Sequence, residues 1–372
     1  MLRCKRDEGT SYPEWEEKRL EDIVLFLDEK RKPITSNLRN KGIYPYYGAS
    51  GIIDYVDEYI FDEELVLLSE DGANIIDRNY PVCYIAKGKY WVNNHAHVLK
   101  SKEGLNNYLL KELLEKIDYK KYNSGTAQPK LNQETCRKLV VNIPCLEEQQ
   151  KIADFLSEVD NIIAMSEKEI ESLEMQKKGA MQKIFSHEVR FKADDGSEYP
   201  EWEEKKISEL FNISAGGDID REKCTSEKTD SNIYPVYANA ITKNGLYGYT
   251  DTFKIDGETI TVTGRGDVGI AKARKEKYYP IVRLLVLTPK NKLDVLFFEA
   301  VINKIKFYEE YTGVPQLTAP QIGKMKVKFP CLEEQQKIAD LLSEFDNAIE
   351  YAKEELEVWM NIKKGLLQQM FE

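Results

Sequence analysis

The sequence lacks the segments that mark membrane or secreted proteins. No window holds 18 uncharged apolar residues, so we expect no membrane-spanning helix. The opening residues, Met1 to Glu8, contain no apolar stretch of the kind found in a secretory signal. The 6 cysteines form no Cys-x-x-Cys pair, which favours free thiols in a reducing cytoplasm. We expect Cys145 and Cys331 to be small buried thiols.

Catalytic motifs are missing as well. The chain has no Gly-x-Ser-x-Gly, no P-loop, no His-Glu-x-x-His and no Asn-Pro-Pro-Tyr-like sequence of an adenine methyltransferase. Residues 264–269 fit the dinucleotide pattern G-x-G-x-x-G, but a charged stretch and Tyr278-Tyr279-Pro280 follow in place of a clean helix. We therefore predict a turn between strands there, not a nucleotide site. We expect a binding protein without a catalytic role.

Histidine is scarce, with 3 in the chain. His95 and His97 are predicted to share one face of a strand, and the remaining histidine, His187, falls on a long helix. No Cys/His spacing supports a metal site, so we expect no metal and no cofactor. Contact with bases or backbone, or packing, remains open for this segment.

What the sequence does contain is a duplication. Residues 144–154 recur letter for letter at 330–340, an offset of 186 in a chain of 372 residues. A second marker, Tyr12 to Lys18, recurs at Tyr199 to Lys205, so the whole unit is duplicated. We interpret the Trp and Tyr of this marker as a structural plug that anchors each globular unit to a helix end.

A long helix is predicted after each copy of the first marker. Apolar residues recur at alternating spacings of four and three for more than four heptads, which forms an a/d seam along the helix. Both copies carry Glu-Glu in the first turn, after a Pro, and both place a lysine on the seam at the same register. The alternative is that each helix is a core helix of its own half, but about 40 unbroken residues, roughly 60 Å, are too long for that. We predict that the two pair as an antiparallel coiled coil through Ile152, Leu156, Val159, Ile163, Ile170, Leu173, Ile338, Leu342, Phe345, Ile349, Leu356 and Trp359.

The acidic residues are concentrated in these helices. Residues 146–188 hold 10 acidic and 5 basic side chains, and residues 332–372 hold 10 and 4, which accounts for the whole net charge of -11. The other segments hold 44 of each sign. The globular halves can therefore each present a basic face.

The two globular segments read as mixed α/β domains of one plan. Short apolar runs broken by turn residues predict strands at 44–48, 54–56, 65–68 and 80–85, and helical periodicity covers 107–122. The second segment repeats this order, with strands at 234–237 and 259–262 and a helix at 295–311. The fold class is mixed α+β with two globular domains and two long helices.

Basic residues interleaved with aromatics and amides suggest nucleic-acid contact, because Lys and Arg neutralise phosphate while amides and Arg read base edges. Each cluster alone is also compatible with an ordinary solvated surface. The candidates are Lys30, Arg31, Lys32, Arg39, Lys41, Tyr46, Tyr47, Lys87, Lys89, Trp91, Asn93, Asn94, His95, Lys121, Ser124, Thr126, Gln128, Lys130, Lys243, Asn244, Arg265, Lys272, Arg274, Lys275, Gln316 and Thr318.

The twice-occurring Pro-x-Leu-Glu-Glu-Gln-Gln-Lys-Ile-Ala helix start resembles the specificity subunit of type I restriction-modification systems. The Lys-Lys-Gly-Leu-Leu-Gln-Gln-Met-Phe ending and the alternation of globular unit with repeated helix are similar too. The resemblance covers essentially the full chain. It implies target recognition domains at 1–143 and 189–329, and conserved helical spacers at 144–188 and 330–372.

In that family each recognition domain reads one half of a bipartite DNA site, and the helices set the spacer and dock methyltransferase subunits. The resemblance also implies a nuclease-translocase partner and S-adenosylmethionine on the methyltransferase, which flips its target adenine. Loops 124–131 and 312–318 fall where the family approaches the groove. The alternative is a coiled-coil scaffold with two protein- or glycan-binding modules, which salt-sensitive binding to duplex DNA would distinguish.

Overall fold

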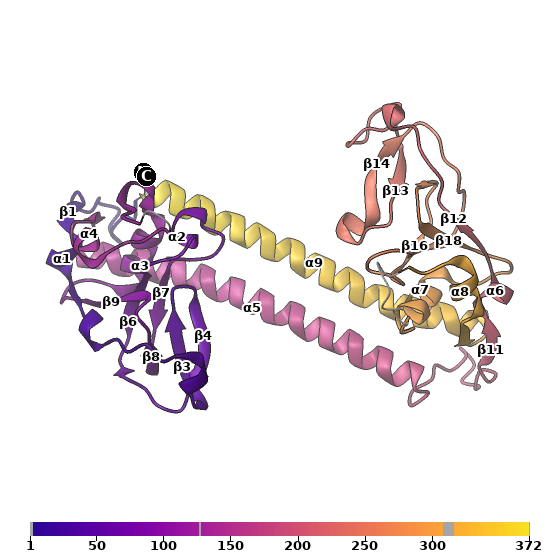
Figure 1. Ribbon diagram of the computed structural model, residues 1–372, viewed down its shortest axis with the longest axis horizontal. Coiled ribbons are helices and arrows are strands. Elements are labelled where there is room, and N and C mark those ends of the chain that lie inside the picture. The colour runs from indigo at the N-terminus through magenta and orange to yellow at the C-terminus, as the bar shows by residue number, and fades with distance from the viewer. Residues whose placement is uncertain (1–2, 126–127, 308–315, 372) are drawn as a thin grey trace. The chain divides into compact units, whose positions relative to one another are not determined.

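The computed structural model describes residues 3–125, 128–307 and 316–371, which form two compact units. One unit spans Met1–Glu169 with Lys353–Glu372, and the other spans Ile170–Ala352. Each unit therefore contains one globular domain and a segment of both long helices (Figure 1).

The first globular domain is built on β6 (Leu65–Ser69), a strand buried along its whole length. Val66 and Leu68 pack in the same apolar cluster as the inner face of α3 (Asn107–Lys116), whereas Leu65 and Leu67 pack in another cluster with Phe61 and Tyr90. Burial on both faces explains why this strand is a continuous apolar run with no alternation of polar residues.

Two four-stranded sheets and one two-stranded ribbon make up this domain. Their orders are β2 (Val24–Phe26), β9 (Ala96–Ser101), β6 and β7 (Cys83–Ala86); then β4 (Gly51–Val56), β3 (Lys41–Gly48), β8 (Lys89–Val92) and β5 (Phe61–Asp62); then β1 (Glu16–Arg19) with β10 (Val140–Ile143). The short helices are α1 (Leu20–Ile23), α2 (Asn74–Asp77), α4 (Gln133–Arg137), η1 (Asp28–Lys30), η2 (Ser36–Leu38) and η3 (Tyr119–Tyr122).

The second domain repeats this plan. Its sheets are β12 (Phe211–Ala215), β18 (Leu284–Pro289), β15 (Thr259–Thr263) and β16 (Ala271–Arg274); β14 (Leu246–Thr250), β13 (Tyr234–Tyr237) and β17 (Tyr279–Pro280); and β11 (Glu203–Lys206) with β19 (Lys326–Phe329). Its helices are α6 (Ile207–Leu210), α7 (Val295–Asn303), α8 (Ala319–Lys324), η4 (Arg221–Lys223) and η5 (Thr242–Gly245). The mixed α/β prediction is confirmed, and residues 264–269 form the predicted turn, which joins β15 to β16.

The two predicted long helices are present as α5 (Leu146–Phe185) and α9 (Leu332–Phe371), each 40 residues without a break. In the first unit, Ile152 packs in one cluster with Met370. In the second unit, Ile184 packs in one cluster with Ile338. All twelve predicted pairing residues are buried or half-buried, while Met165, off the seam, is 71% exposed. The helices therefore run antiparallel and face each other through the a/d seam.

A lysine–aspartate pair crosses between the helices in each unit. Lys363 Nζ lies 2.6 Å from Asp160 Oδ1 in the first, and Lys177 Nζ lies 2.5 Å from Asp346 Oδ1 in the second. The two pairs are repeat equivalents, because each partner differs from its counterpart by 186 positions. A polar contact on an apolar seam favours one alignment over others.

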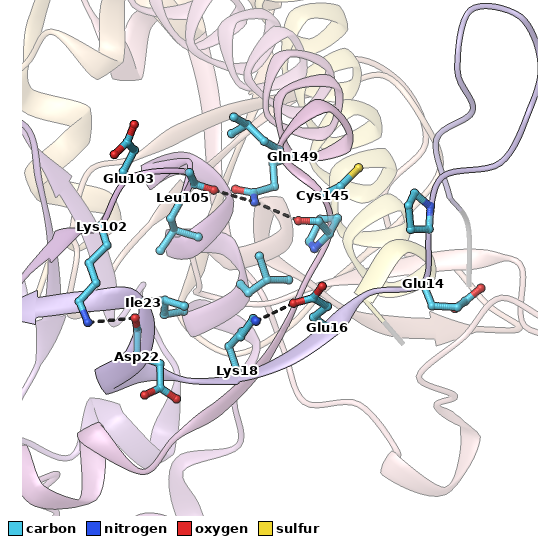
Figure 2. Close-up of a pocket in the computed structure, with 15 residues that line it drawn as sticks. Glu14, Glu16, Lys18, Asp22, Ile23, Lys102, Glu103, Leu105, Cys145 and Gln149 are labelled. Atoms are coloured by element: carbon cyan, nitrogen blue, oxygen red, sulfur yellow. Dashed lines mark hydrogen bonds and ion pairs between the residues drawn. The ribbon is translucent and has the colours of Figure 1, made fainter.

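The start of each long helix is fastened to its domain by the same side chain. Gln149 Nε2 donates to the carbonyl oxygens of Gly104 and Pro144, at 3.0 Å each, while its Oε1 accepts from the backbone N–H of Asn106. Figure 2 shows this joint beside a cleft of about 350 Å³ whose rim carries Glu14, Glu16, Asp22 and Glu103. Gln335 repeats the joint in the second unit with Pro330 and Asp294. Lys18 and Lys102 also line this cleft, so its charged side chains carry both signs.

A buried ion pair completes each junction. Glu148, 0% exposed, binds Arg3 with Nη2 at 2.8 Å, and Glu334, also 0% exposed, binds Arg190 at the same distance. These two ion pairs are called the clasps below. Loss of either arginine should destabilise its unit, because an unpaired carboxylate in such a buried position is strongly unfavourable.

The repeated tryptophan packs as the predicted plug. In the first unit, the rings of Trp15 and Phe371 are 5.8 Å apart. In the second, Trp202 lies 6.1 Å from Phe185 and 5.8 Å from Phe297. In both units the ring closes the contact between a helix end and the domain.

Some local predictions are corrected. The helix predicted over 107–122 ends at Lys116, because Ile117 and Asp118 are extended and Asp118 caps the separate turn η3. The helix predicted over 295–311 ends at Asn303, and its residues 308–311 lie outside the described residues. Cys145 and Cys331 are only half-buried. His95 lies in a turn before β9, so it does not share a strand face with His97.

Across the described ranges, we find no helix that is both long and apolar enough to cross a membrane.

Candidate nucleic-acid interface

The predicted reading loop of the first domain closes on itself through Asn123. The Oδ1 atom of Asn123 accepts from the N–H groups of Gly125 and Lys130, at 2.9 and 3.0 Å. Ser124 adds two bonds to the carbonyl oxygen of Lys130. Ser124, Gln128 and Lys130 are exposed, whereas Thr126 lies outside the described residues. The loop therefore has a fixed base and exposed polar groups, as groove contact requires.

The base of this loop rests on the segment after β6. Leu131 donates its N–H to the Glu70 carbonyl at 2.7 Å, and Gly72 donates to the Pro129 carbonyl at 3.0 Å. The Glu70 carboxylate lies 3.2 Å from Lys130 Nζ and 2.6 Å from Arg31 Nη1. The structure thus brings Arg31 and Lys130 to the same carboxylate, and Arg31 Nη1 also donates to the Asn94 carbonyl at 3.5 Å.

His95 belongs to the same surface. Its Nδ1 atom lies 2.8 Å from Asp71 Oδ2, and its side chain is 49% exposed. Asn93 holds the preceding turn, with its Oδ1 accepting from the His95 N–H at 2.7 Å. Asn93 is itself buried, so it supports this turn and does not reach outward.

Beneath the loop lies a buried polar cluster around His97. Its Nδ1 is 2.7 Å from Asp28 Oδ2 and its Nε2 is 2.7 Å from the Leu131 carbonyl. Burial opposes a charge on the ring, but the interactions with Asp28 and Cys136 together outweigh it and raise the pKa of His97 to about 10. Because both ring nitrogens face acceptors, His97 is a doubly protonated imidazolium that donates to both.

Asp28 is satisfied on all sides. Burial acts against its ionised form, but His97, the N–H of Val98 and Arg31 together lower the pKa of this carboxyl. Gln133 Nε2 also donates to Asp28 Oδ2 at 2.8 Å. The loop therefore rests on a charged pair, not on an apolar core.

A second group of candidates gathers where β3 pairs with β8. Arg39 lies 4.4 Å above the Tyr46 ring and 3.1 Å from Asp54 Oδ2. Lys41 and Lys89 are exposed on these strands, and Lys89 lies 4.7 Å above the ring of Tyr59. Cations held over aromatic rings on an exposed hairpin are an arrangement suited to a phosphate backbone.

In the second domain, Arg265 and Gln316 form a backbone bridge at the base of the equivalent loop. Asn239 fixes this base, since its Oδ1 accepts from the N–H groups of Gly264 and Arg265 and its Nδ2 donates to the Arg265 carbonyl at 2.6 Å. Both bridging side chains are exposed and Thr318 is half-buried. Residues 312–315 of the predicted loop lie outside the described residues.

Lys243 and Asn244 form a left-handed turn in the same domain, with φ of 49° and 53°. Arg274 donates to the Asn244 carbonyl at 2.5 Å and stacks on the Tyr237 ring at 3.6 Å. Lys272 instead lies 3.3 Å from Glu299 on α7. The second-domain candidates therefore lie in three places: Arg265 and Gln316 at the loop base, Lys243 and Asn244 in this turn, and Lys272 beside α7.

Four candidates are corrected because their side chains are buried. Tyr46 is 1% exposed and its hydroxyl accepts from the Ile34 N–H, while Trp91 is 8% exposed and donates to the Lys32 carbonyl. Asn93 and Arg274 are 4% and 6% exposed. These side chains hold turns and strands in place, so they cannot touch DNA in this structure.

The other described candidates are exposed or half-buried. The exposed ones are Lys30, Lys32, Lys41, Lys87, Lys89, Asn94, His95, Lys121, Ser124, Gln128, Lys130, Lys243, Asn244, Arg265, Lys272, Lys275 and Gln316; the half-buried ones are Arg31, Arg39, Tyr47 and Thr318. Sequence reasoning missed Asp28, Glu70 and Asn239, which are the supports of the exposed groups. Only His97 gave a signal, as a histidine two residues from another in a chain with 3.

Known proteins share both the sequence pattern and the fold. The family described as type I restriction modification DNA specificity domain matches twice, at residues 12–175 and 199–358. A putative type I specificity subunit of Mycoplasma pneumoniae is 29% identical over 310 residues, covering 82% of this chain and 81% of its own. A type I restriction enzyme specificity subunit of Methanocaldococcus jannaschii is 27% identical, covering 98% of this chain and 93% of its own.

A solved structure has the same architecture. The S subunit of a type I restriction-modification system from M. genitalium superposes with a TM-score of 0.70 at 16% identity, covering 100% of this chain and 99% of that one. At this identity the likeness concerns the fold alone.

Proposed function

Because this chain belongs to the type I restriction-modification DNA specificity family, we propose that it binds double-stranded DNA at a bipartite site. Each globular domain reads one half of the site, and the helix pair sets the spacer between the halves. The observation that carries this proposal is the contrast between repeated helix contacts and unlike loop bases. One frame holding two different readers is what a two-part, asymmetric target requires.

The chain itself is proposed to have no catalytic role. An adenine methyltransferase would dock on the long helices, use S-adenosylmethionine and flip its base, and a nuclease-translocase subunit would join the complex. Off-seam apolar side chains support docking: Phe155 is 47%, Met165 71% and Met360 54% exposed in the first unit. Exposed apolar side chains on an acidic helix pair suit a protein partner and not DNA. We place the complex in the cytoplasm.

Domain exchange tests the recognition part of the proposal. The full chain is incubated with a pool of duplexes of random sequence at fixed salt, and bound duplexes are sequenced. The wild type should enrich two defined half-sites at one spacing. Replacing residues 1–143 with another recognition domain should change one half-site and leave the other unchanged. A change in both halves, or no enrichment by the wild type, contradicts the proposal.

Co-purification tests the docking part. Charge reversal at Glu147 and Glu333, both exposed in the first turn of their helices, should weaken retention of the methyltransferase subunit. Glu147 also lies 3.6 Å from Arg6, so Glu333 gives the cleaner result. Undiminished co-purification by both variants would count against this docking surface.

A further inference from the structure

The two domains anchor their reading loops alike through the backbone and differently through side chains. Leu131 donates to the Glu70 carbonyl at 2.7 Å, and Leu317 donates to the Gly264 carbonyl at 2.9 Å. Two residues before these carbonyls, Leu68 pairs with His97 and Val262 pairs with Leu285. Leu285 therefore occupies the place of His97.

The rest of the polar cluster is replaced in the same way. Ala215 pairs with Leu285, and extending the β2–β9 register by two residues past Phe26 sets Asp28 opposite His97 in the same way. The first residue of the short helix after the loop is Gln133 in one domain and Ala319 in the other. Where the first domain has an acid, an imidazolium and an amide, the second domain thus has the exposed Ala215, the buried Leu285 and the half-buried Ala319.

This substitution changes how the loop is held. His97 Nε2 donates to the Leu131 carbonyl at 2.7 Å, the residue at which the reading loop ends. His97 is 0% exposed and cannot turn away to solvent, because Asp28 Oδ2 holds its other nitrogen at 2.7 Å. A charge-assisted bond inside the protein is stronger and more directional than an apolar contact. The first loop is therefore anchored by a charged side chain at the carbonyl where it ends, whereas among the described residues of the second domain the side-chain anchor is the neutral Asn239, which holds the N–H groups of Gly264 and Arg265.

We propose that His97, oriented by Asp28, is a positioning residue for the first domain's reading loop, and that base discrimination in the first half-site depends on it. This inference rests on the proposed function. It assigns no DNA contact to His97 itself. It predicts that the two half-sites respond differently when the buried pair is replaced.

The chain supplies the matched variants. The double change Asp28→Ala with His97→Leu copies the residues of the second domain and leaves no unpaired buried charge. His97→Gln keeps one neutral donor for the Leu131 carbonyl. Val98→Ala is the control, because Val98 is the next buried residue of β9, packs in the cluster on the other face and leaves both His97 bonds in place.

The first readout needs no DNA. Amide hydrogen exchange at Lys130 and Leu131 should speed up at least tenfold in the double variant and less in His97→Gln, with Leu317 unchanged. Val98→Ala should leave the loop amides within twofold of wild type. Equal exchange at Leu131 in the double variant and the wild type would overturn the proposal.

The second readout is selection from the random duplex pool with the full chain. Discrimination against mismatched bases should fall about tenfold in the half-site assigned to residues 1–143, and stay within twofold in the other. Loss in both halves, or in neither, contradicts the role of His97 while leaving the proposed function standing. If the wild type enriches nothing, the proposed function fails and this inference fails with it, even if the exchange result holds.

Discussion

The two halves of the chain repeat the main contacts where each domain meets a helix, and make different contacts under each reading loop. Gln149 and Gln335 bond the same kinds of backbone groups, and Glu148 and Glu334 bind Arg3 and Arg190 at one distance. Beneath the loops, the first domain has the charged pair of Asp28 and His97, and the equivalent positions of the second domain are an alanine and a leucine. The two copies therefore share their helix–domain contacts and differ in the residues that support their reading loops.

This difference has a physical basis. The glutamate and glutamine side chains of the joints are buried and paired, so a change in one partner alone leaves an unpaired charge or amide. The loop supports can be replaced as a set, because an apolar group of similar shape needs no partner. A domain can therefore acquire a new recognition surface without disturbing its attachment to the helices.

The clasps should give the largest effect. Arg190→Ala leaves the buried Glu334 carboxylate without its cationic partner and should cost about 3–5 kcal/mol of unfolding free energy in the second unit. Arg3→Ala should cost about 1.5 kcal/mol less in the first unit, since Trp15 Nε1 still donates to the Glu148 carboxylate at 3.1 Å. Hydrogen exchange resolves the two units separately. Equal losses would show that the tryptophan bond contributes nothing, and the exposed Glu333→Gln serves as control.

The seam lysines should differ by a smaller amount. Lys363 bridges Asp160 and the buried Glu112, whose Oε1 is 3.3 Å away, whereas the Asp346 partner of Lys177 is 60% exposed. Lys363→Met should therefore cost about 2 kcal/mol and Lys177→Met less than about 1 kcal/mol. Urea unfolding of both variants measures the two losses of stability. A larger loss for Lys177→Met would contradict the claim that the Lys363 pair stabilises the protein more.

Raising the pH should weaken the first domain's loop support. The folded pKa of His97 is about 10, above its usual value of 6.5, so its contribution is complete below about pH 6.5 and lost as pH rises toward 10. Asp28, whose pKa is lowered, stays ionised over this range, and Glu70, Arg31 and Cys136 are the other groups near the ring.

The stability advantage of the wild type over the Asp28→Ala/His97→Leu variant should shrink between pH 7 and pH 10. Urea unfolding of the two proteins at matched pH measures it. The difference between them removes the titration of lysines and tyrosines elsewhere. A difference that stays constant with pH contradicts the charged state of His97.

The smallest effect is expected from single exposed lysines. Lys243→Gln and Lys121→Gln should each weaken DNA binding similarly for all sequences and lower the slope of log affinity against log salt by about 1. Filter binding at several salt concentrations measures the slope. A loss confined to one base position would instead mark the residue as a base reader.

The long elements were predictable from the sequence and their supports were not. Heptad spacing from Ile152 onward defines α5 because local periodicity and burial agree along its length. The clasps could not be predicted, since Arg3 and Glu148 are 145 positions apart and no periodicity links them. Predictions of contact residues failed at Tyr46 and Trp91 because aromatics beside lysines suit both a core strand and a DNA surface.

The helix pair is proposed to set the spacer, and changing its length tests this role directly. Seven residues are inserted after Glu169 and, at the repeat-equivalent position, after Glu355, which lengthens each helix by about 10 Å. Selection from the random duplex pool should then return the same two half-sites with a spacer longer by about 3 base pairs, at about 3.4 Å per base pair. An unchanged spacer with intact half-sites would contradict the central claim.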